Sequence, residues 1–417
     1  MKKLNLKSLL ALVLTLCMLL GSVAALAEEE IVAQGTEAPA TEVPQVQTPA
    51  AETPAAPAEP AAPAEATPTV TVAAGETAGQ VNVTITDDSN KTTNQAVYVD
   101  LDVNYTYDEA TDTEKSTPYT SVNVNKNPAL IDANGNALIS GATDLNVNMG
   151  LVADNLEKPV VNYVDREYDE NGNLIYEYTE YTNDANALDV YVGEVHPKGN
   201  VTFTTGDVYS ASSAKLDNSD DVAAYGLYVS NYQKESTVTG TVNGDIFTKA
   251  AAPKTEATET DPAKKAQEEK IIRNSLDADA YALMASAYNG ATEEITVTGS
   301  VTAIATAVNG DAYARAERER VDEKAKATLT TGDVIANAQS STGDANAIAV
   351  EYENDEGQIN GTFGNLTATA TGAMSADATG ISYAYDDASG ATALKTGSIT
   401  ATATLTENKN LKPDERQ

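Results

Sequence analysis

Two short elements alternate along the second half of this sequence at a nearly constant spacing. The first is a glycine followed by Asp, Asn or Ser and then by an aliphatic residue, and the second is an aspartate followed mainly by small residues. The first begins at Gly206, Gly244, Gly299, Gly332, Gly364 and Gly397, and the second at Asp184, Asp221, Asp277, Asp311, Asp344 and Asp377. From Asp277 onward both elements recur every 32 to 34 residues. A fixed period of this length predicts a solenoid in which each repeat forms one coil.

Residues within each repeat alternate with a period of two. Between positions 301 and 307, small and aliphatic residues alternate with Thr and Ile. This period places successive side chains on opposite faces of a strand, and abundant Thr and Val also favour strands. Because Ala favours helices, a solenoid of stacked helices is the alternative, although the Gly and Thr content argues against it. The sequence therefore predicts an all-β fold: a parallel β-helix over residues 184–405, with about 33 residues per coil, a glycine at one bend and a right-handed crossover.

Equivalent residues of successive coils are expected to stack about 4.8 Å apart. The interior they form must be thin, because the chain has no Trp and only 3 Phe. One inward column is predicted to contain Val208, Ile246, Val301, Val334, Leu366 and Ile399, and a second Ser210, Thr248, Ala303, Ala336, Ala368 and Ala401. The aspartate element would add the pairs Ala278/Ala280, Ala312/Ala314 and Ala345/Ala347.

The segments before the repeat differ in composition. Residues 1–27 have a basic start, an apolar stretch and the ending Ala25-Leu26-Ala27, which predict a cleaved signal peptide rather than a membrane anchor. Residues 28–79 are rich in Pro, Ala, Glu and Thr and are expected to be a disordered linker. The chain is therefore expected to be secreted or extracellular, with association at a cell surface as a further option, and to have no transmembrane segment after signal cleavage.

Residues 80–183 are expected to form an irregular β region with inserted hairpins. Asn134-Gly135 and Asn171-Gly172 each lie between alternating apolar runs, which is a hairpin signal. The segment around Asp144 is interpreted as a degenerate copy of the glycine element. An insertion at 251–274 is expected to leave the solenoid wall and to contain a short helix, and residues 406–417 are a charged tail.

Charge and composition exclude several classes of function. The net charge is −36, and removal of the three lysines in the signal peptide takes it to −39, so nucleic acid and anionic membranes are not expected partners. Cys17 is the single cysteine and lies within the signal peptide, which excludes disulfides and Cys-based zinc sites from the mature chain. The single histidine, His196, has no motif for a triad or a metal site near it. No catalytic and no cofactor-binding residue is assigned.

Stacked aspartates pose a problem of charge. If Asp184, Asp221, Asp277, Asp311, Asp344 and Asp377 lie in one column, like charges are about 5 Å apart. Bound Ca²⁺ is one solution, which makes these residues weak calcium candidates. The alternative is that each aspartate accepts backbone N–H bonds at a turn. At the glycine corner Asp207, Asn365 and Ser398 replace one another, which favours the alternative, because all three cap turns.

Signal peptide, Pro/Ala/Glu-rich spacer and glycine/aspartate repeat together resemble the bacterial secreted or surface β-helical repeat proteins that are described as adhesin-like. The resemblance implies a noncatalytic structural or adhesive role outside the cell, with an extracellular ligand or surface polymer as partner. A carbohydrate-active β-helix enzyme and a Ca²⁺-dependent surface assembly module are the alternatives. The last expected strand ends near Leu405 without an evident cap. Three alternatives follow: the natural chain continues beyond this end, a partner covers it, or the chain self-associates through it.

Overall fold

A computed structural model describes residues 69–86, 96–108, 113–124, 127–128, 144–156, 160–168, 174–182, 184–193, 199–213, 221–252, 277–387 and 390–406. The chain divides into two units, and all of these residues belong to the second, Ala61–Gln417. The described residues form strands and turns without a helix, so none of them forms a helix that could cross a membrane. The predicted signal peptide, Asn134-Gly135, His196 and nearly all of the charged tail lie outside the described residues.

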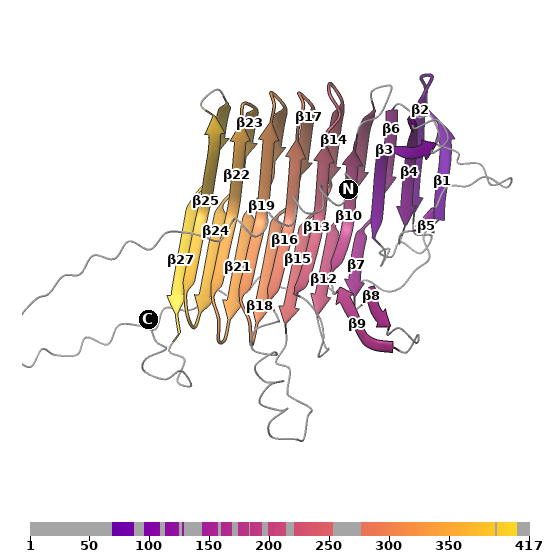
Figure 1. The fold of residues 1–417 in the computed structure, drawn as a ribbon. Coiled ribbons are helices and arrows are strands. Elements are labelled where there is room, and N and C mark those ends of the chain that lie inside the picture. Colours follow the sequence, from indigo (N-terminus) through magenta and orange to yellow (C-terminus); the bar gives the residue numbers. More distant parts are fainter. Residues whose placement is uncertain are drawn as a thin grey trace, which may run out of the picture. The chain divides into compact units, whose positions relative to one another are not determined.

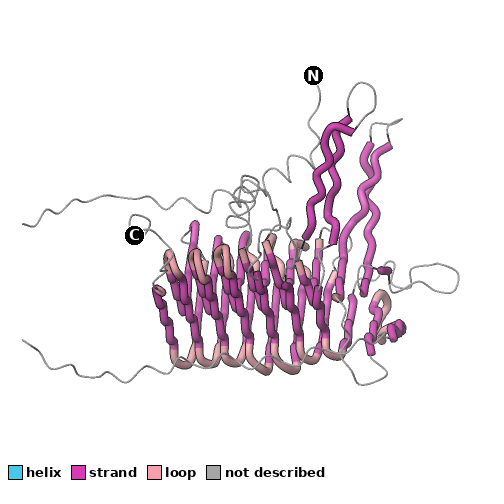
Figure 2. The backbone as a smooth tube through the Cα atoms, turned by 90° about the horizontal axis from the view of Figure 1, so that it is seen from below, coloured by secondary structure: helices cyan, strands magenta, loops and turns pink. Residues whose placement is uncertain are grey.

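Three sheets form the walls of the solenoid, and from β10 onward the chain passes through sheets C, A and B once per coil (Figures 1 and 2). Sheet A contains β1 (Thr69–Ala74), β2 (Gln80–Thr86), β6 (Asp144–Met149), β11 (Asn200–Thr205), β14 (Thr237–Val242), β17 (Thr292–Val297), β20 (Lys326–Thr330), β23 (Gln358–Thr362) and β26 (Ala391–Lys395). Sheet B contains β7 (Val152–Leu156), β12 (Val208–Ser213), β15 (Ile246–Ala252), β18 (Val301–Ala307), β21 (Val334–Ser340), β24 (Leu366–Gly372) and β27 (Ile399–Leu405).

Sheet C contains β5 (Asn127–Pro128), β4 (Thr113–Val124), β3 (Val97–Asp108), β10 (Ala185–Val192), β13 (Val222–Asn231), β16 (Ala278–Ala287), β19 (Ala312–Asp322), β22 (Ala345–Asp355) and β25 (Ala376–Asp387). A separate hairpin pairs β8 (Val160–Tyr168) with β9 (Leu174–Thr182). Figure 1 shows strands of rising number following one another along the solenoid, from indigo β1 at one end to yellow β27 at the other. From β10 to β27 each strand of the three sheets pairs in parallel with its counterpart in the next coil.

This arrangement confirms the predicted all-β fold with stacked parallel strands; its right-handed crossover stays a prediction. The two predicted columns of sheet B are also confirmed, since Val208 pairs with Ile246, then Val301, and so on to Ile399. The predicted alanine pairs of sheet C lie in register from β16 to β22. Small and aliphatic residues thus point into the solenoid, and the residues between them point to its surface, as a period of two requires.

Small residues and glycines make the narrow interior possible. Ala303, Ala336 and Ala368 are each fully buried in one column of sheet B. Where a ring enters the interior, a glycine of the next coil makes room for it: a Cβ atom on Gly240 would lie 2.2 Å from Cζ of its neighbour Phe203. Such close packing leaves no space for an added methyl group unless the ring moves.

The region before β10 differs from the prediction in two places. Strand β1 lies within the segment that was expected to be linker, where it pairs antiparallel with β2, so the folded part begins earlier than predicted. The segment at Asp144 is not a copy of the glycine element, because it forms β6 in sheet A. Gly150 takes that place instead: Gly206 donates its N–H to the Gly150 carbonyl, and Val152 pairs with Val208.

Hairpins decorate this first part of the solenoid. The prediction around Asn171-Gly172 is confirmed, because β8 and β9 on either side of it pair antiparallel. A second hairpin, of β3 and β4, was not predicted. The insertion expected at 251–274 follows β15, which ends at Ala252; residues 253–276, with the predicted helix, lie outside the described residues.

In the last coil that the structure describes, β25–β27, interior side chains are exposed. Ile399 and Leu405 of β27 are 51% and 60% exposed, and Leu394 of β26 is 36% exposed. In the preceding coil the counterpart of Ile399, Leu366, is fully buried, because β24 is covered by β27. The described residues therefore include an open apolar end, as the sequence indicated.

Candidate functional sites

The structure brings four of the six predicted calcium candidates into one column at the corner between sheets B and C. Asp221, Asp277, Asp311 and Asp344 each lie directly before a strand of sheet C, and those strands are in register. The placement of the other two was wrong. Ala185 pairs with Ala224, which puts Asp184 level with Ala223. Ala376 pairs with Ala345, so Ser375 takes the column position and Asp377 faces Asn346.

Each central aspartate of this column accepts a backbone hydrogen bond from the next coil. The Asp311 N–H donates to Asp277 Oδ1 at 2.7 Å, and the Asp344 N–H donates to Asp311 Oδ1 at 2.7 Å. Partial burial, followed by the charges of Asp221, Asp311 and Asp344, raises the pKa of Asp277 to about 6, although its hydrogen bond opposes the shift. The aspartates of this corner thus cap the backbone of the next coil, although their stacked like charges repel one another.

At the glycine corner, between sheets A and B, two kinds of hydrogen bond join successive coils. Successive glycines bond backbone to backbone: Gly332 donates to the Gly299 carbonyl and Gly364 to the Gly332 carbonyl, both at 2.9 Å. The next residue caps the following coil, as where the Asn365 N–H donates to Asp333 Oδ1 at 2.7 Å. A Cβ atom on Gly332 would lie 2.3 Å from the Gly299 carbonyl oxygen, so only glycine allows this approach.

Among the described residues, no group of three or more His, Cys, Asp or Glu side chains is arranged to hold a metal ion. The hydrogen bonds at both corners follow the capping pattern. The structure therefore places four of the calcium candidates in one column, Asp221, Asp277, Asp311 and Asp344. Among the residues that it describes, these aspartates do not form a set of ligands around a common point.

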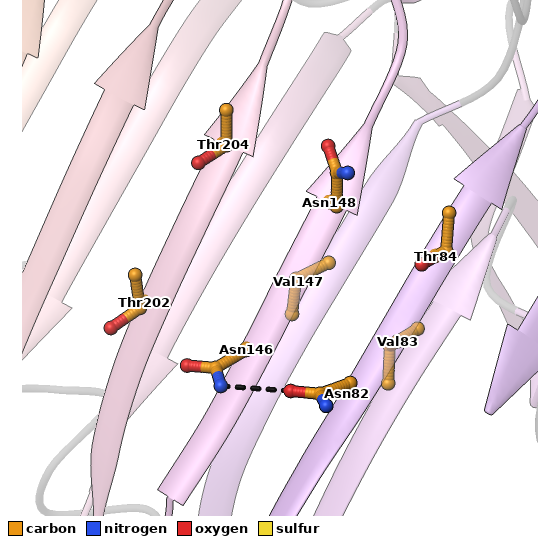
Figure 3. A pocket seen from close by; sticks show the side chains of 8 residues that line it. All are labelled: Asn82, Val83, Thr84, Asn146, Val147, Asn148, Thr202 and Thr204. Atoms are coloured by element: carbon orange, nitrogen blue, oxygen red, sulfur yellow. Dashed lines mark hydrogen bonds between the residues drawn. The ribbon is translucent and has the colours of Figure 1, made fainter. Parts of the chain in front are cut away.

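A shallow polar groove lies on the outer face of sheet A, near its first strands (Figure 3). Its volume is about 330 Å³, and its lining residues are Asn82, Val83, Thr84, Asn146, Val147, Asn148, Thr202 and Thr204. The Asn146 amide donates to Asn82 Oδ1 at 2.8 Å, which links two neighbouring coils. The lining has hydroxyl and amide groups but no carboxylate, so it offers neither a general acid nor a general base.

The groove is one end of a longer polar face. Two outward columns continue across sheet A, and all of their side chains from β17 to β23 are exposed. One column contains Thr84, Asn148, Thr204, Thr241, Thr296, Thr330 and Thr362, and the other Asn82, Asn146, Thr202, Thr239, Glu294, Thr328 and Asn360. We call these two columns the threonine face. From β2 to β23, Glu294 is the only charged member, and in β26 the two columns continue with Ala393 and Lys395. One acidic and one basic residue leave a nearly neutral strip on a strongly acidic chain.

The outer face of sheet C is aromatic and charged instead. Tyr225 stacks on Tyr281 with ring centroids 5.2 Å apart, and Arg315 lies over the Tyr281 ring at 5.8 Å. Farther along β19, Arg318 pairs with Glu353 of β22 at 2.7 Å. These stacks and partly exposed ion pairs join coils, each contributing on the order of 1 kcal/mol or less.

Three glutamates occupy interior positions that hold aliphatic residues in earlier coils. Glu317 follows Leu227 and Leu283 in one column of sheet C, and Glu319 follows Ala285 in the next. In sheet A, Glu293 follows Val238. All three glutamates are 0% exposed.

Most polar atoms of this cluster have no hydrogen-bond partner. Both carboxylate oxygens of Glu293 and of Glu319 are unpartnered, as is the buried hydroxyl of Tyr352, which neighbours Glu319 in the next coil. Only Glu317 has a partner, the Thr331 hydroxyl at 3.4 Å. By contrast, the buried Ser210 hydroxyl donates to a backbone carbonyl at 3.0 Å.

Burial without a countercharge shifts the acidity of this cluster. Burial raises the pKa of Glu317 to about 8 and holds the pKa of Glu293 well above its usual range. The pKa of Glu319 is raised by burial and by the charges of Glu293 and Glu317. Burial and the charges of Glu317 and Glu319 also raise the pKa of the Tyr352 phenol. Carboxyl groups in such surroundings hold their protons at neutral pH.

Sequence reasoning missed the interior glutamates, although a signal was present. In residues 315–320 the order Arg-Ala-Glu-Arg-Glu-Arg puts Arg318 and Arg320 on one face of a strand and Glu317 and Glu319 on the other. The register with Leu283 then decides which face is interior.

Comparison of the chain with protein-family models, with curated proteins and with solved structures finds no match.

Proposed function

We propose that this chain is a secreted or cell-surface, noncatalytic structural protein whose solenoid adheres to a neutral extracellular polysaccharide. The observation that carries the proposal is the threonine face, a regular and nearly uncharged strip on a protein of net charge −36. Its hydroxyl and amide groups recur at the coil spacing, so that many weak hydrogen bonds add up along a polymer chain.

Charge supports a neutral ligand rather than an acidic one. An anionic polymer is repelled by the acidic surface, whereas a neutral polyol bears the donors and acceptors that Thr and Asn match. The enzyme alternative receives less support, because the groove of the threonine face has no carboxylate in its lining. The open end at β25–β27 fits association with a second copy, which would cover Ile399 and Leu405.

Binding and catalysis are tested together on cellulose, chitin and a soluble neutral glucan. We expect the chain to bind at least one of them and to release no reducing ends. The variant Thr241→Val/Thr296→Val/Thr330→Val removes three hydroxyls of the threonine face while keeping strand propensity, and we expect at least a tenfold loss of affinity.

The matched control is Thr367→Val/Thr369→Val/Thr402→Val on the outer face of sheet B, for which we expect less than a twofold change. Equal effects of the two variants would remove the threonine face as the binding site. Release of reducing ends would favour the enzyme alternative, and a lack of binding to all three polymers would overturn adhesion to neutral polysaccharide.

The compartment is tested separately by expression of the whole sequence in a secreting bacterial host. We expect the chain in the medium or at the cell surface, with Glu28 as its first residue. Retention of residues 1–27 on an intracellular chain would contradict the proposed location.

A further inference from the structure

We propose that Glu293, Glu317 and Glu319 form a proton-binding switch inside the solenoid: with protons bound, the surrounding coils stay closed, and loss of the protons opens them. The glutamates come from β17 and β19, which belong to two successive coils, and all three are 0% exposed. The buried Tyr352 hydroxyl is an independent sign of a polar site, since it also lacks a partner.

No opposite charge faces the cluster from the elements around it. The interior residues of the neighbouring strands of sheets C and A are Leu283, Ala285, Val350, Tyr352, Val238, Ala327, Leu329 and Ile359. Those of sheet B are Ala303, Ala305, Ala336 and Ala338. Among the described residues, the titratable groups facing the cluster are therefore its own members and Tyr352.

The cations nearest in sequence are used elsewhere. Arg315 and Arg318 pair with Glu351, and Arg320 pairs with Asp322, all on the outer side of sheet C. Alternation from Glu317 onward places Arg318 and Arg320 on the opposite face of β19 from Glu317 and Glu319, and Arg315 lies over the ring of Tyr281 on the outer face. A proton is consequently the ligand that removes the cost of burying each carboxylate, because no group of the cluster is arranged to hold a metal ion.

The direction of the pH dependence follows from the raised pKa values of the three glutamates. A carboxyl group whose pKa is higher in the folded than in the unfolded chain supports folding fully below the unfolded value, near pH 4.5. That support declines as the pH rises and is lost through the folded value, which is about 8 for Glu317. Between these limits each buried group makes the unfolding equilibrium constant rise about tenfold per pH unit.

The test compares the whole chain with the variant Glu293→Gln/Glu317→Gln/Glu319→Gln, in which each glutamine imitates a protonated glutamate. Denaturant unfolding is followed from pH 5.5 to 9. We expect the unfolding constant of the unmodified chain to rise at least tenfold more per pH unit than that of the variant. Asp189, Asp277 and Asp279 also have raised pKa values, but they are present in both proteins and cancel in the difference. Equal slopes would overturn the proposal.

A second measurement does not depend on the folding of the variant. The infrared spectrum of the unmodified chain in D₂O at pH 7 is expected to contain the C=O band of protonated carboxyl groups, which disappears on alkaline titration. Asp189 and Asp279 also contribute to this band, because burial raises their pKa values to about 7, so the exchange of the strands around the cluster is measured with it. Hydrogen exchange of β17, β19 and β22 is expected to accelerate as the band disappears, beyond the intrinsic pH effect. Absence of the band at pH 7, or its loss without faster exchange in these strands, contradicts the switch.

Discussion

Acidic side chains lie on successive coils in two regions of this solenoid, and the two regions treat them differently. At the corner between sheets B and C, Asp277 and Asp311 each accept a backbone N–H of the next coil at 2.7 Å. In the interior, Glu293 and Glu319 have no partner for any carboxylate oxygen. Both regions have the same coil stacking and a parallel register. The difference teaches that register fixes where a side chain lies, while a nearby backbone donor decides whether a carboxylate is tolerated in charged form.

The largest effect is expected when an acid is moved into the aliphatic part of the interior. Leu227 is 1% exposed and lies two coils before Glu317 in the same column. We expect Leu227→Glu to lower the free energy of unfolding by about 4 kcal/mol at pH 8, because a carboxylate is buried without a partner. The loss should be smaller at pH 5, where the group is protonated more readily. Denaturant unfolding at both pH values measures it, with Leu227→Gln as the uncharged control; identical losses at pH 5 and 8 would contradict the explanation.

A smaller loss of stability is expected when an added Cβ atom forces the backbone of the glycine corner apart. In Gly332→Ala the new Cβ atom lies 2.3 Å from the Gly299 carbonyl oxygen, a backbone atom that cannot rotate away. We expect the free energy of unfolding to fall by about 2 kcal/mol. Gly150→Ala is the matched control from the same column, because no atom lies within 4 Å of its added Cβ, and it should change stability by less than about 0.5 kcal/mol. Similar effects of the two variants in thermal unfolding would show that close approach does not shape this corner.

Substitutions of Asp277 can separate the effect of its charge on stability from the effect of its hydrogen bond. The raised pKa of Asp277, about 6, means that ionisation opposes folding as the pH rises through that value. Asp277→Asn keeps an acceptor for the Asp311 N–H without the charge, and we expect it to stabilise the fold by about 1 kcal/mol at pH 7 after solvent screening. No gain is expected at pH 4. Asp277→Ala loses the acceptor, and we expect a loss of about 1 kcal/mol at pH 4. Destabilisation by Asn at pH 7 would instead point to a bound cation.

The smallest expected effect concerns calcium. Because each corner carboxylate is already used as a cap, we expect the midpoint of thermal unfolding, followed by circular dichroism, to be the same in Ca²⁺ and in EDTA. A marked rise with Ca²⁺ that Asp311→Asn abolishes would make the column a cation site after all.

Much of the fold could be predicted because the sequence repeat has a constant spacing wherever the coils have the same length. The column from Val208 to Ile399 follows from a constant spacing and a clear aliphatic residue in each coil. Asp184 and Asp377 were misplaced because their surroundings are rich in Ala and Asp, so that a shift of two residues gives an equally good alignment while keeping the same faces of the strand.

The candidate sites were harder to predict because they depend on pairing between coils. The threonine face comes from short strands whose Thr residues are separated by corners and an insertion, so that only the register of Thr241 with Thr296 and Thr330 reveals it. The aliphatic pattern predicted an interior of Ala, Val, Ile and Leu. Glu317 departs from that pattern without interrupting the alternation, and its environment became clear from its neighbours Leu283 and Val350.

The hydrogen bonds between successive glycines at the glycine corner, which we call the glycine ladder, have a mechanical consequence. These bonds, like those of the three sheets, join each coil only to the next along the axis of the solenoid. A force that pulls the last strand away from the first therefore loads one coil at a time, and the bonds open in sequence instead of sharing the load. A coil of about 33 residues releases roughly 110 Å of extended chain. Stretching a single molecule is thus expected to give a series of nearly equal steps that begins at β25–β27, the coil with the most exposed interior, and then a longer step from the coil of β13–β15, which is followed by the insertion.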